Sequence, residues 1–238
     1  MSSYIDRVLR TQSSSFAGYW PLNDESGTVA LDWSKADNNA TSASLMRKPA
    51  DRDFLAPDGS KCAKFDGTAS VVNFYTATST AIETEGSMSI WVATPTAKLK
   101  GTTLMQIVKM GADANNLIDI TFDTTAYRFS GIYTGNSTSD TIVSPLVYNT
   151  AYGADWHHFV MTWSKTAEAL NFYVDSVAQT AAATLGVFTG NFAATLMCLG
   201  ASSTTVADLF TGWLSHFALW NGAILSQSEV DDLYKIGL

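Results

Sequence analysis

Hydrophobic and polar residues alternate in several short runs of this chain, as they do in strands that bury one face of a sheet. In Ser87–Thr94, the side chains of Met88, Ile90 and Val92 share one face. The run Trp156–Trp163 alternates in the same way. This period of two predicts antiparallel strands with unlike faces.

Turn dipeptides such as Asp58-Gly59 and Gly135-Asn136 separate the predicted strands, and no helical pattern lies between them. Many strands without intervening helices favour one antiparallel β-sandwich or jelly roll, an all-β fold. The predicted strands are Phe16–Leu22, Cys62–Asp66, Ser70–Tyr75, Ser87–Thr94, Thr103–Met110, Leu117–Phe122, Tyr127–Tyr133, Trp156–Trp163, Leu170–Val174, Thr195–Leu199 and Gly212–Trp220.

A short helix is predicted at each end of the chain. Residues 3–10 place Tyr4, Ile5, Val8 and Leu9 at helical spacing. We therefore expect an N-terminal helix before the first strand.

The C-terminal helix is predicted from its cap. Ser226 and Glu229 have the spacing of a capping box, in which each side chain bonds the other residue's backbone N–H. Val230 and Leu233 follow at helical spacing, and Gly237 can close the helix.

Composition and charge argue against several classes of function. Charged residues are only 15% of the chain, while 28 threonines, 25 serines and 28 aromatic residues supply hydroxyls and rings. The net charge of −8 argues against a nucleic-acid binder, which needs a basic stripe. It also disfavours binding to anionic membrane surfaces. No run reaches the length of a membrane span or the apolar core of a signal peptide, so we expect synthesis in a cytoplasm without export.

Eight motifs occur in order between residues 16 and 237, and together they resemble laminin-G-like, concanavalin A-like lectin/glucanase jelly rolls. The resemblance implies two stacked, curved antiparallel sheets over residues 16–238, with residues 1–15 as an N-terminal helix or docking arm. The motifs are Tyr19–Leu22 with Glu25–Gly27, Asp32–Ser34, Phe65–Gly67, Ser87–Val92, Trp156–Val160, Phe172–Asp175, Phe210–Asn221 and Leu225–Gly237.

Jelly rolls of this kind occur in phage virion proteins, where a short helix often precedes the first motif. The resemblance implies a non-catalytic virion structural protein, for capsid decoration or in a tail. Its partners would be other virion proteins and copies of itself, with a trimer favoured. Tyr4, Ile5, Val8 and Leu9 would then be the assembly residues, and host glycans a further partner.

A carbohydrate-binding, lectin-like module is the other reading, because fold does not fix function. Aromatic side chains in loops can stack on sugar rings. Trp33 and Tyr152 lie in predicted loops and are the candidate glycan-binding residues. The sequence leaves this reading open.

We expect no enzymatic activity and predict no catalytic residue. The glucanases of this superfamily carry a Glu-x-Asp-x-Glu strand, because a retaining glycosidase needs two carboxylates close together. Only five glutamates occur, and none lies in such a pattern. His157 and His158 belong to the motif that resembles a strand start, and we interpret them as packing and hydrogen-bonding residues.

Calcium is the metal that the resemblance suggests, and no other cofactor is expected. Asp32 matches the loop aspartate, and Asp37 and Asn38 supply further oxygen atoms nearby. The position of a second family carboxylate holds Ser215 instead. The competing interpretation is a turn organised by Asp and Asn side chains.

Cys62 and Cys198 are the only cysteines and lie far apart in the sequence. Two cysteines do not make a disulfide framework, so free thiols are favoured, with one bridge left open.

Overall fold

The computed structural model describes most of the chain. The described residues are 3–24, 27–42, 55–75, 84–95, 104–144, 155–179, 184–205 and 207–235.

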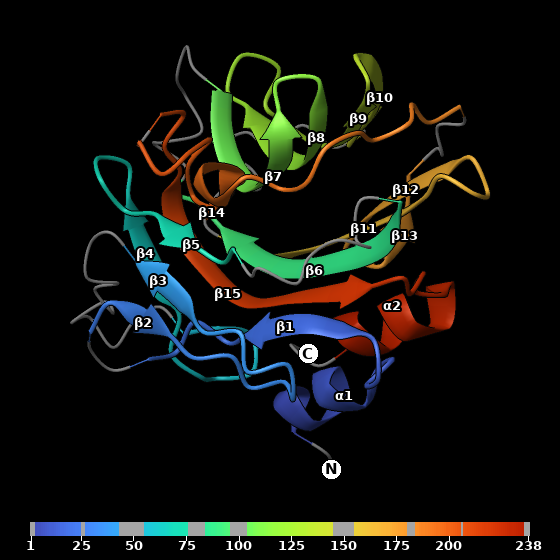
Figure 1. The fold of residues 1–238 in the computed structure, drawn as a ribbon. Coiled ribbons are helices and arrows are strands. Elements are labelled where there is room, and N and C mark those ends of the chain that lie inside the picture. The colour runs from blue at the N-terminus through green and yellow to red at the C-terminus, as the bar shows by residue number, and fades with distance from the viewer. Residues whose placement is uncertain are drawn as a thin grey trace.

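Two antiparallel sheets stack face to face, which confirms the predicted all-β sandwich (Figure 1). The first sheet has seven strands, and β4 (Ala63–Asp66) pairs with one of its central strands, β15 (Thr211–Asn221). The order of the others follows the path β1 (Phe16–Trp20), β15, β6 (Glu85–Ala93), β11 (His157–Ser164), β12 (Ala169–Val174) and β13 (Val177–Ala178).

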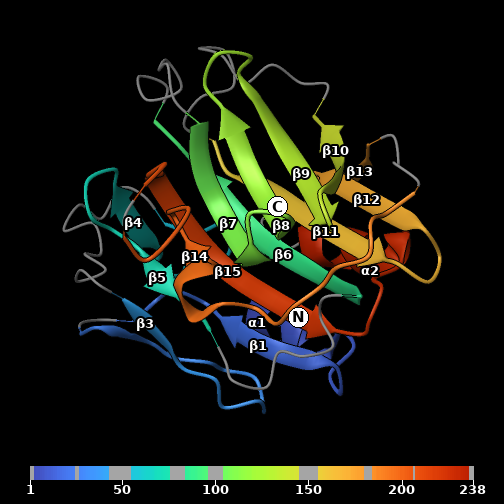
Figure 2. The same ribbon diagram turned by 45° about the horizontal axis from the view of Figure 1, so that its top comes forward.

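The second sheet has eight strands, and Figure 2 shows it from another side. A short 3-10 turn, Ala194–Leu196, leads into one of them. The order is β10 (Thr138–Val143), β9 (Arg128–Gly135), β8 (Asn116–Asp123), β7 (Leu104–Asp113), β14 (Met197–Leu199), β5 (Val72–Asn73), β3 (Ala40–Ser42) and β2 (Val29–Ala30).

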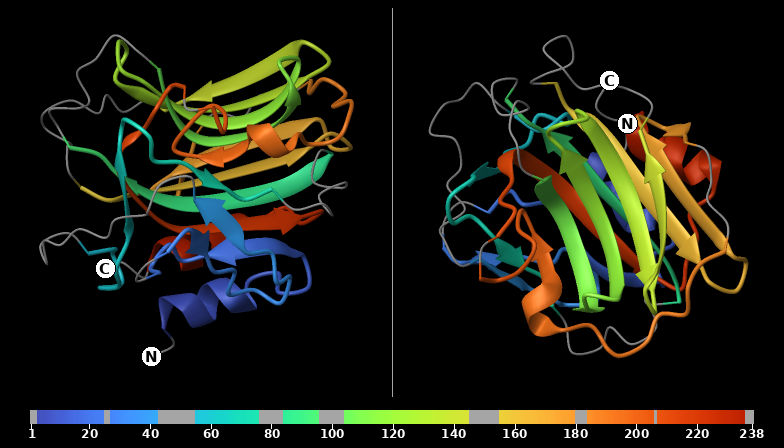
Figure 3. Two further views of the ribbon diagram at one scale, coloured as in Figure 1. Left: turned by 60° about the vertical axis from the view of Figure 1, so that its left-hand side comes forward. Right: turned by 90° about the horizontal axis from the view of Figure 1, so that it is seen from above.

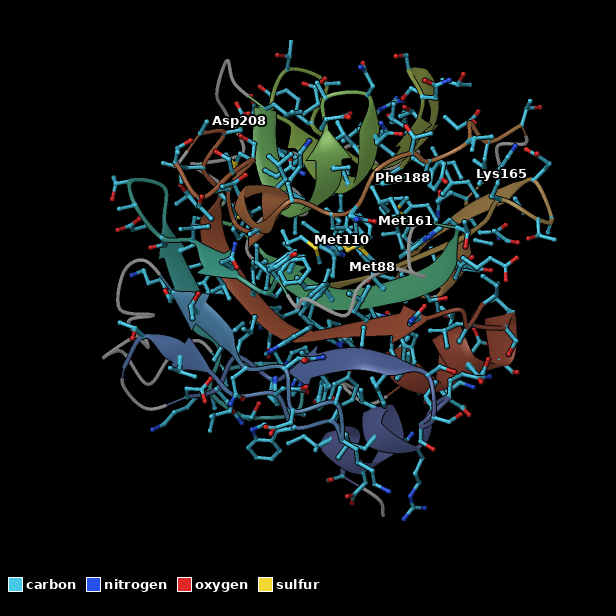
Figure 4. The ribbon with its side chains drawn as sticks, viewed as in Figure 1. Met88, Met110, Met161, Lys165, Phe188 and Asp208 are labelled. Carbon is cyan, nitrogen blue, oxygen red and sulfur yellow. The ribbon has the colours of Figure 1, made fainter. Side chains whose placement is uncertain are left out.

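The main core lies between the two sheets. Met88 and Met161 from the seven-stranded sheet point toward Met110 of the eight-stranded sheet (Figure 4), and all three are fully buried. Large aromatic side chains such as Trp20 and Trp163 complete the layer. Burying side chains of this size contributes roughly 1.5–3 kcal/mol each, so the alternation seen in the sequence is what holds the sheets together.

A second core lies on the outer face of the seven-stranded sheet, under two helices (Figure 1). They are α1 (Tyr4–Arg10) and α2 (Gln227–Tyr234), and both begin with a capping box. The helices bury their apolar sides against the sheet through residues including Val8, Trp91 and Leu233.

The N-terminal helix is therefore packed onto the domain. Tyr4 and Val8 are buried in the second core, while Ile5 and Leu9 are only partly buried. The Trp220 indole N–H donates to the Thr11 carbonyl at 2.9 Å, which fixes the connection to the sheet. A role of Tyr4, Ile5, Val8 and Leu9 in assembly stays a prediction. Tyr4 and Val8 already pack against other residues of the same chain.

Cys62 and Cys198 are both buried and are not joined by a disulfide, as favoured from the sequence. Burial raises the pKa of the Cys62 thiol to about 12 and that of Cys198 to about 11, so both stay protonated at neutral pH. Among the described residues, neither helix has the length and apolar character needed to cross a bilayer.

Candidate functional site

The loop that follows β2 is organised by one carboxylate. Both oxygens of Asp32 accept backbone N–H bonds: Oδ1 from Tyr19 and Ser34, and Oδ2 from Asn38, each at 2.8 Å. Tyr19 lies on β1, the edge strand of the other sheet. The carboxylate therefore ties the loop to the sandwich edge and fixes its backbone.

Trp33 lies in the middle of this fixed loop. Its backbone N–H donates to the Tyr19 carbonyl at 2.8 Å, while 44% of the residue remains exposed. Val29 and Leu31 are also exposed, and they alternate with the buried Ala30. We call these three exposed apolar residues, Val29, Leu31 and Trp33, the edge stripe.

The three predicted calcium residues have other roles here. Both Asp32 oxygens already accept N–H bonds, and Asp37 is exposed with a positive φ of 55°. The Asn38 amide donates to the Ala17 carbonyl at 2.7 Å. By themselves these residues do not form the cage of six to eight oxygen ligands that Ca²⁺ takes, and they match the turn interpretation better.

The second family position also lacks a ligand carboxylate. Ser215 is buried, and its hydroxyl donates to the Pro21 carbonyl at 3.3 Å. Within the described part of the chain, no cluster of three His, Cys, Asp or Glu side chains is placed to hold a metal. Calcium binding stays a prediction that this geometry does not favour.

The aromatic residues that could contact a sugar differ in how far they are exposed. Trp33 is exposed as predicted, whereas Tyr152 lies outside the described residues. Tyr133 is completely buried in the core. Trp213 is partly buried, with the Lys64 ammonium 6.0 Å from its ring centre.

The adjacent residues His157 and His158 make packing and hydrogen-bonding contacts, as interpreted from the sequence. His158 is fully buried, bonds the Ser89 hydroxyl through Nε2 at 2.8 Å and stacks on Trp91 with ring centres 4.8 Å apart. Burial lowers the pKa of His158 to about 3, so it stays neutral. His157 bonds Asp175 through Nδ1 at 2.7 Å.

The third histidine joins three segments beneath the helices. His216 contacts the Tyr19 hydroxyl through Nδ1 at 2.8 Å and Asp58 Oδ1 through Nε2 at 3.2 Å. It has a positive φ of 52° at an irregularity in β15. Tyr19 and His216 are 0% and 1% exposed, so this Tyr–His–Asp chain is closed to a substrate and serves to hold the segments together.

Sequence reasoning missed one polar feature, on the outer face of the eight-stranded sheet. Lys109 and Asp119 form an ion pair there, with Nζ and Oδ2 2.9 Å apart. The alternation of β8 points Asp119 away from the core, but it does not show which residue of β7 lies opposite.

Solved structures of low sequence identity share this fold. The receptor-binding domain of botulinum neurotoxin mosaic serotype C/D has a TM-score of 0.68 and 10% identity, over 93% of this chain and 50% of that one. The binding domain of Paraclostridial Mosquitocidal Protein 1 has a TM-score of 0.68 and 13% identity, over 93% and 52%. Trypanosoma rangeli sialidase, solved with sialic acid, has a TM-score of 0.64 and 14% identity, over 93% and 33%.

The chain thus spans about half the length of the toxin binding domains and a third of the sialidase. No curated protein matches it in sequence. A family model described as "Concanavalin A-like lectin/glucanases superfamily" matches residues 66–231, which is well over half of the chain. The chain belongs to the concanavalin A-like lectin/glucanase superfamily.

Proposed function

We propose that this protein is a non-catalytic glycan-binding protein in which Trp33 stacks on a sugar ring. The observation that carries the proposal is that Trp33 is 44% exposed on a loop with a fixed backbone. A preset loop lowers the entropy lost on binding. An exposed ring on such a loop is a suitable platform for the apolar face of a sugar.

The comparisons support a binding role at the level of the fold. Two of the similar structures are toxin binding domains, and the sialidase was solved with sialic acid. At 10–14% identity they share the architecture only, so the sugar that this chain would bind is a separate question.

The absence of catalysis is supported by the charges on the outer sheet face. A retaining glycosidase places two carboxyl groups about 5–5.5 Å apart. In the described part of the eight-stranded sheet, the buried carboxylate Asp119 pairs with the ammonium of Lys109. This pair supplies one carboxyl group and one ammonium, and not the two neighbouring carboxyl groups that a retaining glycosidase uses.

Glycan-array binding followed by calorimetry tests the proposal. Trp33→Ala should weaken the binding of the best glycan roughly fivefold or more, because truncating an aromatic anchor costs over about 1 kcal/mol. Trp33→Phe should retain part of the affinity. Tyr75→Ala, which removes another exposed aromatic ring, is the matched control and should bind like the wild type. Equal binding by wild type and Trp33→Ala would refute the role of Trp33.

A second candidate function is that of a virion structural protein, made in a host cytoplasm and assembled with other virion proteins. It is favoured by the helix before the Tyr19-Trp20 motif and by the aliphatic part of the edge stripe, Val29 and Leu31, which suits a protein partner. Mass spectrometry of purified particles should then detect the chain, and light scattering should give a trimer. A monomer absent from particles would exclude this function.

A further inference from the structure

His158 lies on the outer face of the seven-stranded sheet, next to α2. Phe159 beside it points into the main core, so the His158 side chain points to the opposite face. Its ring stacks on Trp91 with ring centres 4.8 Å apart, and the Tyr234 ring of α2 lies nearly parallel to it at 6.3 Å. Figures 1 and 3 show α2 on the side of this sheet that faces away from the eight-stranded sheet. The imidazole is therefore part of the surface against which α2 packs.

The His158 ring is buried with one nitrogen unpartnered. The residue is 0% exposed, and Nε2 lies 2.8 Å from the Ser89 hydroxyl oxygen. Nδ1 is buried and has no hydrogen-bond partner. A neutral imidazole fits this arrangement, because Nδ1 can then be the nitrogen without a hydrogen. A protonated ring would place a positive charge and an unsatisfied N–H inside the second core.

The neighbouring strands do not compensate a charge on this ring. Burial is the largest effect and lowers the pKa of His158 from 6.5 to about 3. Asp175, at the turn after β12, favours the charged form, but its Oδ1 already accepts the His158 backbone N–H and its Oδ2 contacts the His157 ring. His216 on β15 disfavours the charged form. The surroundings therefore keep the His158 ring neutral.

The titratable groups that the two helices bring to this cluster are tyrosines. α2 contributes Tyr234, and α1 contributes Tyr4, whose hydroxyl accepts the Trp91 indole N–H at 2.9 Å. Burial raises the pKa of both tyrosine hydroxyls above the ordinary value of 10, so neither carries a charge in neutral or acidic solution. These groups do not offset a charge on His158.

The burial of His158 makes the contact between α2 and the sheet sensitive to acid. A ring that is exposed by release of α2 regains a pKa near 6.5, whereas the covered ring keeps a pKa near 3. Protons therefore bind preferentially to the released state. The stabilisation from the neutral, buried ring is complete above pH 6.5 and is lost progressively as the pH falls toward 3.

α2 can leave the sheet without breaking the sandwich. Its buried residues Val230 and Leu233 belong to the second core, while a separate cluster fills the space between the two sheets. Within the described part of the chain no strand follows α2, so its release removes no strand pairing there. A segment with its own set of apolar contacts can open locally, at a lower free energy than the whole domain.

We propose that α2 is an acid-released latch: protonation of His158 detaches α2 from the outer face of the seven-stranded sheet while the two sheets stay folded. Release uncovers Trp91, on which Tyr234 stacks at neutral pH with ring centres 5.9 Å apart. The protein then exposes in mild acid an aromatic surface that it covers at neutral pH. This inference does not depend on the proposed role of Trp33.

Carboxylates of α2 also lose contacts in acid, but at lower pH. Hydrogen bonds from Ser176 and Gln227 lower the pKa of Asp231 below 3.8. At Glu229, burial raises the pKa, but hydrogen bonds that include the helix cap outweigh burial and lower this pKa below 4.5. Such contributions are lost only as the pH falls below these ordinary values. The interval from pH 6.5 to pH 5 therefore separates His158 from them.

Amide hydrogen exchange of the full chain, followed by NMR at pH 6.5 and pH 5, tests the latch. After correction for intrinsic exchange rates, the protection factors of the Val230 and Leu233 amides should fall roughly 15-fold, as linkage to one proton with pKa values of 6.5 and about 3 requires. The Ile118 and Ile120 amides of β8 should stay more strongly protected than those of α2. Equal protection of α2 and β8 at pH 5 would show that the sheets open with the helix, and would overturn the proposal.

A double variant removes the titrating ring together with its partner. His158→Phe with Ser89→Ala keeps an aromatic ring beside Trp91 and leaves no hydroxyl unpaired, a replacement that can be nearly neutral for stability. The protection of α2 should then be nearly the same at pH 6.5 and pH 5. The matched control is His157→Gln, which keeps a donor for Asp175 and should retain the full fall in protection. A full fall in the double variant, or its loss in His157→Gln, would refute the role of His158.

The ring signals of wild-type His158 carry the test if the double variant does not fold. Imidazole ¹⁵N shifts at pH 5 should show a neutral His158 in the form whose α2 amides are protected. A charged His158 ring in that form would exclude the latch, and so would unchanged protection of α2 between the two pH values.

Discussion

His216 shows how one residue can hold distant parts of the chain. Its ring joins Tyr19 of β1 to Asp58 in the segment before β4, and its own backbone sits in the left-handed region at an irregularity of β15. The Tyr4 ring packs against its edge with centres 4.4 Å apart. A buried polar network of this kind stabilises only while every member keeps its partner.

Asp58 is the member that titrates in acid. Burial raises the pKa of Asp58, but the hydrogen bond and charge interaction with His216 and the hydrogen bonds from Ser60 together outweigh burial and lower this pKa from 3.8 to about 2. A carboxyl group whose pKa falls on folding contributes stability above its unfolded pKa, and this is lost as the pH falls through the folded value. We therefore expect acid destabilisation between pH 4 and pH 2.

Asp58→Asn should reduce the free energy of unfolding at pH 7 by about 1–2 kcal/mol, allowing for solvent screening of the partly exposed carboxylate. The loss of stability on going from pH 4 to pH 2 should become smaller than in the wild type. Urea denaturation at a series of pH values measures both effects. An unchanged acid limb in the variant would contradict the assignment.

The elements follow the sequence pattern where that pattern is strong. All eleven predicted strands are present with shifted ends, because each buries an apolar row against the core. The strands that were not predicted are short or lie at an edge: β2, β3, β10 and β13. In β10 only Ile142 is buried, so the segment offers too few apolar positions for alternation to be visible.

Of the polar and aromatic features described above, the sequence predicted only those that do not depend on how the strands pair. Trp33 was identified because a ring in a loop is visible in the sequence. The Lys109–Asp119 pair was not, because its members oppose each other only after the irregularity between Gln106 and Val108 has shifted the register of β7 against β8. A shift of one residue in pairing changes every cross-strand partner, and alternation alone does not reveal it.

The free edge at β10 carries an inward-pointing charge. Asp140 lies opposite Tyr133, a core residue, and its Oδ2 is buried without a hydrogen-bond partner. Burial and the nearby Glu168 raise the pKa of Asp140. Charges that point inward on an edge strand discourage the pairing of a second chain.

Asp140→Val should therefore stabilise the monomer and also promote association through this edge. Thermal unfolding measures the first effect and concentration-dependent light scattering the second. Ser139→Val, on the opposite face of the same strand, adds the same side chain without removing the charge. Equal association of the two variants would show that Asp140 does not protect the edge.

At the scale of the whole molecule, two cores share the seven-stranded sheet. The first holds it to the other sheet, and the second holds both helices to its outer face. The Trp91 indole N–H donates to the Tyr4 hydroxyl at 2.9 Å inside the second core. The N-terminal helix therefore contributes to the stability of the domain.

Two double variants separate this contribution from a role in assembly. Tyr4→Ala with Val8→Ala should lower the free energy of unfolding by at least about 3 kcal/mol, because large buried side chains are removed. Ile5→Ala with Leu9→Ala should cost less, since both residues are only partly buried. Calorimetry and sedimentation measure stability and oligomeric state; equal stability losses would contradict the packing described above.

Both helices lie on the same side of the molecule, against the seven-stranded sheet, while β7 and β8 of the other sheet lie on the opposite side (Figure 1). The two helices and the outer face of the eight-stranded sheet are therefore on opposite sides of the molecule. A linker or solid support attached through either helix would present the eight-stranded sheet to the surroundings.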